Sequence, residues 1–446
     1  MYAKYKTING LKESSVENKK ILVLTYYWPP AGGPGVQRWL KFVKYLPVYN
    51  IDPVIITVDE KYATYPSTDN SLLQEINPLV KVHKTKTFEL FSLYQRLFKK
   101  QDIPHSGFVN EGNPSFLDKV VRFVRSNLFI PDPRKGWNRY AVTKAFDIIK
   151  TESIHCVITT GPPHSTHLAG LRIKKKFPEI NWISDLRDPW TDIYYYDQLY
   201  HSVLSRRADK RFEKKVTERC DKLVVVGESM KKMLLEKYKN IESGKIHIIP
   251  NGYDPDDFKD INGEKPEHFT ITYTGTLAHN YNISAFLKAV KELNTEGKNI
   301  KVRFIGKLSG NWITTIKELN LTENIEIHET VPHTESIKFL IKSHLLLLVI
   351  PENRHNKAIL TGKIFEYIAV KKPVLNIGPV DGDAAIVISE NEIGETFNYN
   401  DLTGIKTFIT EQFSFYVNNK PQQLPDKANR FYTRNNLTGE LVKILF

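Results

Sequence analysis

Lys363 and Glu366 stand three residues apart in IPENRHNKAILTGKIFEYIAVKKPVLNIGP, residues 350 to 379. On a helix this spacing puts both side chains on one face, so they would reach the same ligand. A lysine ammonium can neutralise a diphosphate, and a carboxylate can accept two hydrogen bonds from ribose hydroxyls. The pair therefore predicts a nucleotide site, with an ordinary surface ion pair as the alternative.

A glycine-rich turn offers a second kind of chemistry. Gly32, Gly33 and Gly35 follow an apolar run and open a basic helix in KKILVLTYYWPPAGGPGVQRWLKFVKYL, residues 19 to 46. Their backbone amides can approach an anion near the positive helix end. The order G-G-P-G is not the G-x-G-x-x-G of dinucleotide-binding turns, although Asp59 follows the next strand. We predict an anion or substrate loop, with a tight turn as the alternative.

Two histidines follow another apolar run in TTGPPHSTHLAGL, residues 159 to 171. His164 and His167 are three apart and share one helical face. A metal site would need a third ligand, and none is identified in the sequence. We expect His164 to contact substrate and His167 to pack in the interior.

A third polar cluster is SDLRDPW, residues 184 to 190, in which two carboxylates flank Arg187. An internal salt bridge to the arginine is one interpretation. The other is a carboxylate that faces substrate, because parallel sheets place functional loops at strand ends. We take Asp188 as the candidate for that role.

Parallel strands would bring these residues together. Short apolar or β-branched runs alternate with helical periodicity from residue 19 onward, which predicts parallel strands covered by helices. The expected strands are at 21–27, 53–58, 155–160, 181–186, 222–227, 269–275, 301–306, 325–328, 345–350 and 373–378. Ligands of such sheets bind at the carboxyl ends of the strands.

The alternation is interrupted by IIPNGYDPDDF, residues 248 to 258, and the polar stretch after it. With 446 residues, the chain exceeds the roughly 250 to 300 residues at which single cores divide. We expect four parts, namely a Rossmann-like domain at 1–250, a linker at 251–267, a second Rossmann-like domain at 268–420, and a helix at 421–446 that packs back on the first domain.

Basic residues dominate one region of the chain. The net charge is +13, and residues 81 to 150 hold 14 Lys and Arg against 6 Asp and Glu. Such an excess fits a phosphate-rich partner or a solvated face. Nucleic acid is not expected, since no helix-turn-helix, RNP or zinc signature is found in the sequence.

Within this region, SFLDKVVRFVRSNLFIPDPRKGW has helical periodicity. An apolar face of this kind belongs most often to the core, which is our expectation here. If exposed, the helix would rest in an anionic membrane interface, which would suit a lipid-linked acceptor. That face is formed by Leu117, Val120, Val121, Val124 and Leu128.

The cysteines and the apolar runs indicate the expected cellular location. Cys156 and Cys220 are too few for a disulfide framework, and the polar first twenty residues lack a signal-peptide apolar region. The longest aliphatic run, LLLLVI, is far below the roughly 20 residues that span a bilayer. We expect a cytoplasmic protein, peripheral at the inner face of the membrane.

Four segments occur in a telling order: the strand-turn-glycine start, IIPNGYDPDDF, ITYTGTL and GKIFEYIAVKKPVL. They resemble the retaining, nucleotide-sugar-dependent glycosyltransferases of the glycogen-synthase-like family, and the resemblance covers nearly the whole chain. It implies the GT-B fold, an α/β architecture of two facing Rossmann-like doubly wound domains with a cleft between them. The first would be the acceptor side and the second the donor side.

Matching positions give the implied roles of individual residues. Glu366 would bind the nucleotide ribose, Lys363 and the amides near Gly362 would lie by the donor phosphates, and Gly33 would approach the reacting centre. The expected catalytic residues are Gly33, His164 and Asp188. The expected donor site is Gly275, Lys307, Arg354, Lys357, Gly362, Lys363 and Glu366.

Two positions depart from the family pattern. Its first glutamate, eight positions before Glu366, is here Ala358, and the arginine that often follows the TG strand is here Thr276. Lys307, Arg354 and Lys357 are therefore taken as substitutes that clamp the diphosphate.

The resemblance implies transfer of a sugar from a nucleotide-diphosphate sugar to a glycan or lipid-linked acceptor in cell-surface polysaccharide synthesis. The donor's own phosphate oxygen would receive the acceptor proton, with neither metal nor cofactor. A sugar-nucleotide epimerase on the same fold and a catalytically inactive GT-B scaffold are the alternatives.

Overall fold

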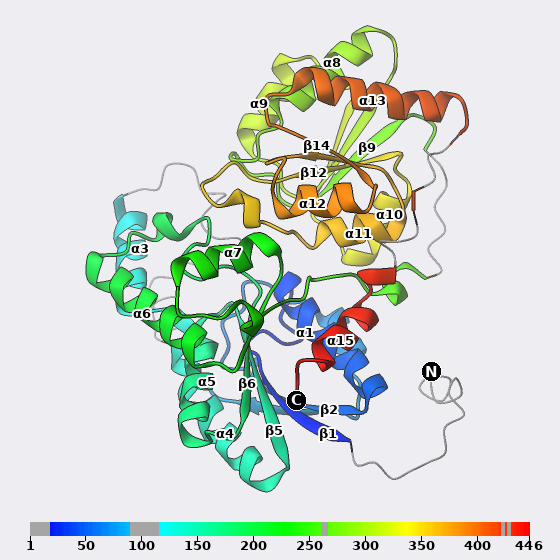
Figure 1. The fold of residues 1–446 in the computed structure, drawn as a ribbon. Helices are drawn as coiled ribbons and strands as arrows, with labels where there is room; N and C mark the ends of the chain where they lie inside the picture. Colours follow the sequence, from blue (N-terminus) through cyan, green and yellow to red (C-terminus); the bar gives the residue numbers. More distant parts are fainter. Residues whose placement is uncertain (1–17, 90–115, 260–265, 421–423, 426–429) are drawn as a thin grey trace, which may run out of the picture.

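Two parallel sheets form the framework of the protein (Figure 1). The computed structural model describes residues 18–89, 116–259, 266–420, 424–425 and 430–446. The first sheet has seven strands in the order β3-β2-β1-β5-β6-β7-β8, and the second has six in the order β11-β10-β9-β12-β13-β14. Every pairing is parallel, and both orders reverse beside the first strand, as in doubly wound nucleotide-binding folds. The expected fold class is confirmed.

The first domain consists of the seven-stranded sheet and the helices on its two faces. Its strands are β1 (Lys19–Leu24), β2 (Ile51–Val58), β3 (Lys81–Thr85), β5 (Ile154–Gly161), β6 (Asn181–Leu186), β7 (Lys222–Val225) and β8 (Ile246–Ile248). Its α-helices are α1 (Pro34–Tyr45), α3 (Phe116–Leu128), α4 (Asn138–Thr151), α5 (Ser165–Lys176), α6 (Val203–Arg219) and α7 (Glu228–Lys237). Short 3-10 helices are η2 (Leu46–Tyr49), η3 (Asn70–Glu75), η4 (Pro133–Trp137), η5 (Tyr196–Leu199) and η6 (Ser243–Lys245).

The second domain repeats the plan on a smaller scale. Its strands are β9 (Thr270–Thr274), β10 (Lys301–Ile305), β11 (Ile325–His328), β12 (Leu345–Val349), β13 (Val374–Ile377) and β14 (Gly394–Phe397). Its helices are α8 (Ser284–Thr295), α9 (Gly310–Glu318), α10 (His333–Ile341), η8 (Asn356–Ala358), α11 (Lys363–Val370), α12 (Asp383–Glu390) and α13 (Leu402–Val417).

Burial explains why these segments are strands. All five residues of β9 and of β12 are buried, because helices cover both faces of the sheet. In the first domain, alternate residues of β1 belong to two different core clusters, one on each face. This arrangement fixes the strand register and places the carboxyl end of each strand at one edge of its sheet.

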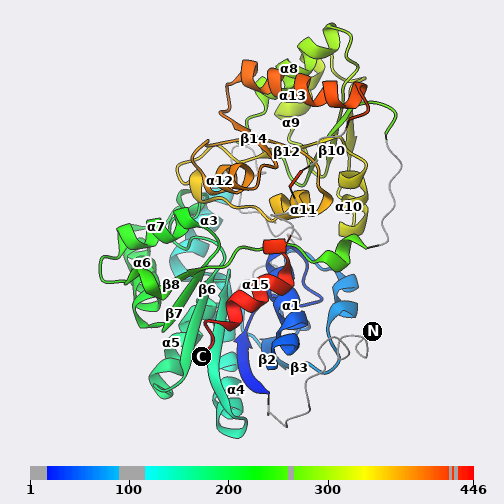
Figure 2. The same ribbon diagram turned by 45° about the vertical axis from the view of Figure 1, so that its right-hand side comes forward.

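The segment between β8 and β9 connects the two domains, and we call it the crossing. It includes η7 (Pro255–Phe258). The chain then returns at its end, where α15 (Arg434–Val442) lies beside α1 (Figure 2). Leu437 and Leu441 of α15 belong to the same core cluster as β1 and α1. The final helix therefore packs on the first domain.

The apolar face of α3 was expected to lie in the core, and the structure differs from this expectation. Its apolar residues Val120, Phe123, Val124 and Leu128 are 43 to 73% exposed, whereas Arg122 is only 5% exposed. The side chains of Leu117 and Val121 lie outside the described set. The core expectation for this face is therefore wrong, because α3 turns polar groups inward and leaves its apolar stripe uncovered by the described part of the chain.

No helix among the described residues is long and apolar enough to cross a bilayer.

Candidate active site

Lys363 opens α11 at the carboxyl edge of the second sheet. Its ammonium donates a hydrogen bond to the Tyr273 hydroxyl at 2.8 Å and lies 4.1 Å from the centre of that ring. Gly275, at the end of β9, has φ +107°, and a Cβ there would lie 2.7 Å from the lysine nitrogen. Glycine is thus needed at 275 both for the backbone conformation and for the space that Lys363 occupies.

The environment of Lys363 changes its acidity. Burial of the ammonium lowers its pKa to about 7, although the nearby Glu366 carboxylate acts in the opposite direction. The lysine can therefore gain a proton near neutral pH when an anion arrives beside it. Such a group is suited to holding a diphosphate in a site sheltered from water.

Glu366 lies one turn further along α11. Its carboxylate is 3.0 Å from Nε2 of His333, the first residue of α10, and both side chains are partly exposed. The hydrogen bond to Glu366 raises the pKa of His333, while burial acts against it. His333 was missed in the sequence, because a single histidine at the start of a helix gives no signal of its partner.

The other expected donor residues are arranged differently. Gly362 caps α11 with open space where a side chain would stand, so its backbone is accessible. Lys307 and Arg354 are exposed. Lys357 is also exposed, and its ammonium is 2.5 Å from Asp381. The contacts of the described residues join Gly275, Lys363 and Glu366 into one group. Lys307 lies beside this group through its backbone, because its carbonyl accepts a hydrogen bond from the Leu277 amide at 2.8 Å, whereas these contacts do not connect Arg354 and Lys357 to it.

The departures from the family pattern can also be located. Ala358 lies in η8 and is 5% exposed. The carbonyl of Thr276 accepts the hydrogen bond of the Tyr273 hydroxyl at 2.8 Å. Position 276 therefore orients the tyrosine that holds Lys363, and it supplies no charge.

The carboxyl edge of the first sheet holds the predicted turn. Gly33 is the N-cap of α1 and has φ +99°, and a Cβ at this position would have nothing within 4 Å of it. At Gly35 a Cβ would lie 2.4 Å from Nη1 of Arg187, so the guanidinium packs against the turn itself. Arg187 in turn pairs with Asp188 at 2.7 Å, and Asp188 remains 38% exposed. The salt-bridge interpretation thus holds for Asp188, and the carboxylate still reaches solvent.

The two histidines after β5 have different surroundings. His164 stacks on Trp190 with ring centres 5.0 Å apart, and burial lowers its pKa to about 4 although Asp188 opposes the change. It is neutral at pH 7. His167 is fully buried, and its Nδ1 lies 2.9 Å from the Thr159 hydroxyl and 3.0 Å from the Ser184 hydroxyl. His167 is an interior residue. His164 is partly open to solvent, but both of its ring nitrogens are buried.

Arg38 and Asp185 form a buried ion pair that the sequence did not indicate. Each side chain is 1% exposed, and the Arg38 guanidinium lies 2.8 Å from the carboxylate. Arg38 also donates to the carbonyls of Ile249 and Pro250, each at 3.0 Å. The pair therefore ties α1 and β6 to the start of the crossing, and Asp185 is not available to substrate.

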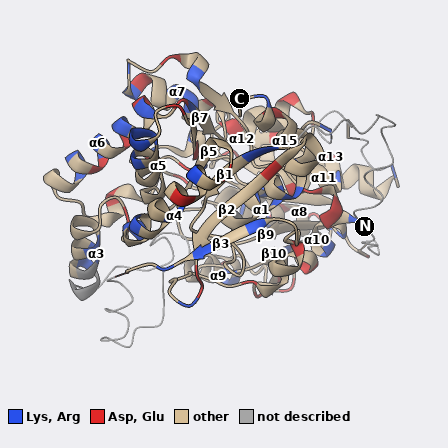
Figure 3. Cartoon of the chain, turned by 90° about the horizontal axis from the view of Figure 1, so that it is seen from below, with Lys and Arg blue, Asp and Glu red and all other residues tan. Residues whose placement is uncertain are grey.

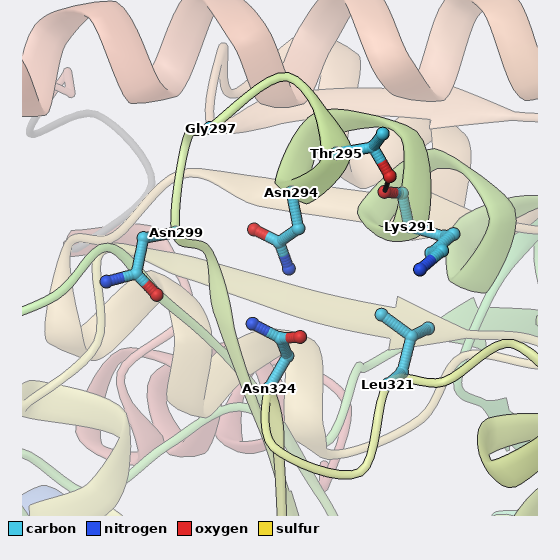
Figure 4. Close-up of a pocket in the computed structure, with 7 residues that line it drawn as sticks. All are labelled: Lys291, Asn294, Thr295, Gly297, Asn299, Leu321 and Asn324. Carbon is cyan, nitrogen blue, oxygen red and sulfur yellow. Dashed lines mark hydrogen bonds between the residues drawn. The ribbon is translucent and has the colours of Figure 1, made fainter.

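A polar depression lies at the opposite end of the second sheet from Lys363 (Figure 4). It is bordered by Lys291, Thr295 and three asparagines. Asn294 hydrogen bonds both backbone groups of Ile300, so its amide holds the loop in place. The described residues contain no group of three or more His, Cys, Asp and Glu side chains placed to hold a metal ion.

Family models match both halves of the chain. The model described as Glycosyltransferase Family 4 matches residues 95–257, and the model described as Glycosyl transferases group 1 matches residues 254–402. The chain carries both domains of a GT-B glycosyltransferase. Comparison with curated protein sequences gives no match.

Several solved structures share the fold over nearly the whole chain. A glycosyltransferase from Rickettsia africae is 16% identical, with a TM-score of 0.59, covering 96% of this chain and 98% of that one. HepE from Anabaena, crystallised with UDP, is 12% identical, with a TM-score of 0.59 and coverage of 96% and 99%. TarM from S. aureus, crystallised as a mutant with UDP, Fondaparinux and α-GlcNAc-glycerol, is 13% identical, with the same TM-score and coverage. These likenesses show the GT-B fold of this glycosyltransferase.

Proposed function

We propose that this glycosyltransferase moves a sugar from a nucleoside-diphosphate sugar to a glycan or lipid-linked acceptor, with retention of anomeric configuration. The observation that carries the proposal is the group formed by Gly275, Lys363 and Glu366 at the carboxyl edge of the second sheet. Parallel α/β sheets bind nucleotides at this edge, beside the strand where the order reverses. HepE and TarM, which share the fold, were crystallised with UDP.

The donor would lie along α11. Lys363, released from Tyr273, would pair with the diphosphate, and the amides beginning at Gly362 would donate to the same phosphates. Glu366 would accept hydrogen bonds from the ribose hydroxyls, with His333 fixing the orientation of the carboxylate. These groups would stabilise the charge that develops on the departing diphosphate, so no metal is required in the proposed mechanism.

The acceptor would approach from the first domain. Gly33 leaves room beside the turn, and the partly exposed Asp188 carboxylate supplies polar atoms at the same edge. The neutral His164 would have to turn its buried ring nitrogens toward the acceptor to contact it. In retaining transfer, the acceptor hydroxyl would give its proton to the donor's phosphate oxygen as the bond to the sugar forms on the same face. The protein then contributes mainly positioning and electrostatic stabilisation.

We further propose a role in cell-surface polysaccharide synthesis, with the protein in the cytoplasm and peripheral at the inner face of the membrane. The support is the basic character of the first domain and the uncovered apolar stripe of α3. A lipid-linked acceptor would be presented at such a surface.

The donor site is tested by calorimetric titration of the protein with UDP, GDP, ADP, CDP and dTDP. We expect one of them to bind, and we expect Glu366→Ala to weaken binding by about tenfold or more, since a charged hydrogen-bond acceptor is lost. The matched control is Glu335→Ala, an exposed carboxylate of α10 paired with Lys338.

Product analysis then separates the activities. Transfer of sugar to an added acceptor supports the glycosyltransferase, and conversion of the donor without acceptor would support the epimerase instead. Binding that is unaffected by Glu366→Ala would refute the donor-site assignment, and a folded protein that binds and converts no donor would be the inactive scaffold.

A further inference from the structure

Helix α3 has the burial of an inverted surface helix. Phe123 and Leu128 are 48% and 73% exposed, whereas Arg122 and Ser126 are 5% and 4% exposed. A surface helix of a globular protein normally buries its apolar stripe and exposes its charges. Exposing that stripe costs free energy in water, so the arrangement indicates a surface that is covered by something else in use.

The start of α6 extends this apolar surface. The Asn127 side chain donates to the Tyr200 carbonyl at 3.2 Å and accepts from the Ser202 amide at 2.8 Å. These bonds hold the end of α3 against the residues that cap α6. The first two residues of α6, Val203 and Leu204, are 65% and 76% exposed. We name the set Val120, Phe123, Val124, Leu128, Val203 and Leu204 the apolar patch.

Basic residues flank the apolar patch. Beyond its first turn, α6 exposes six basic side chains and one acidic side chain, because its other two carboxylates, Asp209 and Glu213, are each 1% exposed. The exposed basic residues are Arg207, Lys210, Arg211, Lys214, Lys215 and Arg219. Figure 3 shows α3 and α6 along one side of the first domain, with Lys and Arg colouring α6 and the neighbouring α5. The same side therefore combines apolar side chains with positive charge.

We propose that the apolar patch and the basic side of α6 form a docking surface for an anionic lipid bilayer. An interfacial site needs apolar side chains that enter the acyl boundary and cations that face the lipid phosphates, and both are present on this flank. A protein partner would need acidic groups and an apolar face of matching shape, whereas the phosphates and acyl chains of an anionic bilayer meet the basic and the apolar groups without a fixed shape. The proposal deepens the proposed function, since it rests on an acceptor that is presented at a membrane.

The docking surface lies near the carboxyl edge of the first sheet, where the acceptor is proposed to bind and which we call the acceptor edge. Arg125 of α3 is partly buried and lies within electrostatic reach of Arg134, Tyr27 and Tyr195. Tyr195 also interacts with Arg187 and Asp188, the residues that pack at the glycine turn. Helix α3 also packs against η5, which directly follows Tyr195, so its inward side lies near the acceptor edge while its outward side would meet lipid. A lipid-linked acceptor bound at that edge would have its lipid near the docking surface.

The test is cosedimentation of the full chain with vesicles of phosphatidylcholine containing about 30% phosphatidylglycerol, and with vesicles of phosphatidylcholine alone. We expect binding to the anionic vesicles that falls with salt. Leu128→Ser/Leu204→Ser, at two highly exposed positions, should weaken it by about tenfold, because apolar side chains no longer enter the acyl boundary. Its control is Leu79→Ser/Val417→Ser, at positions 78% and 57% exposed outside the patch.

The electrostatic part is tested by Arg207→Glu/Arg211→Glu, compared with Lys288→Glu/Lys317→Glu on the second domain, which changes the net charge equally. We expect only the first pair to abolish binding to anionic vesicles. Binding by the wild type to neither vesicle, or equal binding by the patch variants and their controls, would overturn the proposal. So would sedimentation velocity showing that the patch joins two copies of the chain in place of lipid.

Nucleotide titration of the same variants keeps the two proposals apart. All four should bind the nucleoside diphosphate as the wild type does, since none of the substituted residues belongs to the donor site. Vesicle binding without any nucleotide binding would refute the proposed function and leave the docking surface standing.

Discussion

At the scale of single residues, Lys363 lowers the stability of the protein without nucleotide and strengthens the binding of nucleotide. Burial that lowers its pKa to about 7 means that folding disfavours its charged form. We predict that Lys363→Met stabilises the protein by about 1–2 kcal/mol at pH 7 and weakens binding of the nucleoside diphosphate by about tenfold or more. Thermal unfolding and calorimetric titration measure the two effects.

Lys338→Met is the matched control, because Lys338 is exposed and pairs with the neighbouring Glu335 on α10. It should change neither quantity. A destabilised Lys363→Met variant that binds nucleotide normally would show that the lysine serves the fold.

The same residue predicts how donor affinity depends on pH. The pKa of Lys363 is about 7 in the free protein and must rise when a diphosphate is bound beside it, so binding takes up a proton above pH 7. Affinity should be greatest below pH 7 and fall by about tenfold per pH unit above it, until the pKa of the bound state is reached.

A nucleoside-diphosphate sugar is the ligand for this measurement, because its diphosphate does not titrate in the range from about pH 6 to 9. Lys363→Arg keeps its charge throughout and should flatten the profile. A wild-type profile that is already flat would contradict the role given to Lys363.

The separation of two partners along the sequence decides whether their contact could be predicted from the sequence. Lys363 and Glu366 share a helix turn, so their spacing alone puts them on one face. His333 is 33 residues from Glu366 and Tyr273 is 90 residues from Lys363, and only the pairing of β9 with β12 brings the tyrosine near. Arg38 and Asp185 are separated in the same way, so no local pattern indicates their ion pair.

At the scale of elements, apolar runs that alternate with helical segments predicted the parallel strands that are buried on both faces. Three edge strands were not predicted. β3 and β14 carry mostly polar side chains, as in KVHKT and GETF, and β8 has only three residues. Helix α3 shows a different limit. Its periodicity gave the helix but could not say which face is inward, since that depends on the elements packed against it.

The Arg38–Asp185 pair joins α1, β6 and the start of the crossing. Its loss should lower the free energy of unfolding. Burial opposes ionisation of Asp185, but Arg38, Trp39 and Thr160 hold its pKa below the usual range. The stability that this carboxylate supplies is therefore present above its unfolded pKa and lost as pH falls through the lower folded pKa. We predict that Asp185→Asn costs about 3–5 kcal/mol at pH 7, because Arg38 is left buried without its counter-ion.

Denaturant unfolding measures this cost. The matched control is Glu326→Gln, which removes an ion pair with Arg303 in which the carboxylate is 47% exposed, and it should cost less than about 1 kcal/mol. An equal loss of unfolding free energy in the two variants would mean that Asp185 does not hold α1, β6 and the crossing together.

At the scale of the whole molecule, Asp383 links the two domains through a helix end. This residue begins α12 of the second domain, and its Oδ1 accepts hydrogen bonds from the Ser229 amide at 2.9 Å and the Ser229 hydroxyl at 2.6 Å. Ser229 lies in the first turn of α7 in the first domain. Asp383 therefore supplies, from the other domain, the cap that α7 lacks in its own sequence.

The contact leaves no room for a larger residue at the helix start. A Cβ at Gly227 would lie 2.1 Å from Oδ2 of Asp383. Both residues follow strands whose carboxyl ends face the other domain, since β7 precedes Gly227 and β13 precedes Asp383. The cap thus forms only while the donor and acceptor edges are close, and it is lost when the domains separate.

Asp383→Ala should therefore open the molecule as well as weaken α7. We expect a cost of about 1 kcal/mol in stability, as for other lost caps, and an increase in the radius of gyration measured by small-angle X-ray scattering without nucleotide. Asp401→Ala is the control, because Asp401 caps α13 within the second domain by accepting from the Gly404 amide at 2.8 Å. It should cost a similar amount and leave the radius unchanged. An unchanged radius for Asp383→Ala would mean that other contacts between the domains, such as those of α7 with η8, hold the two edges together.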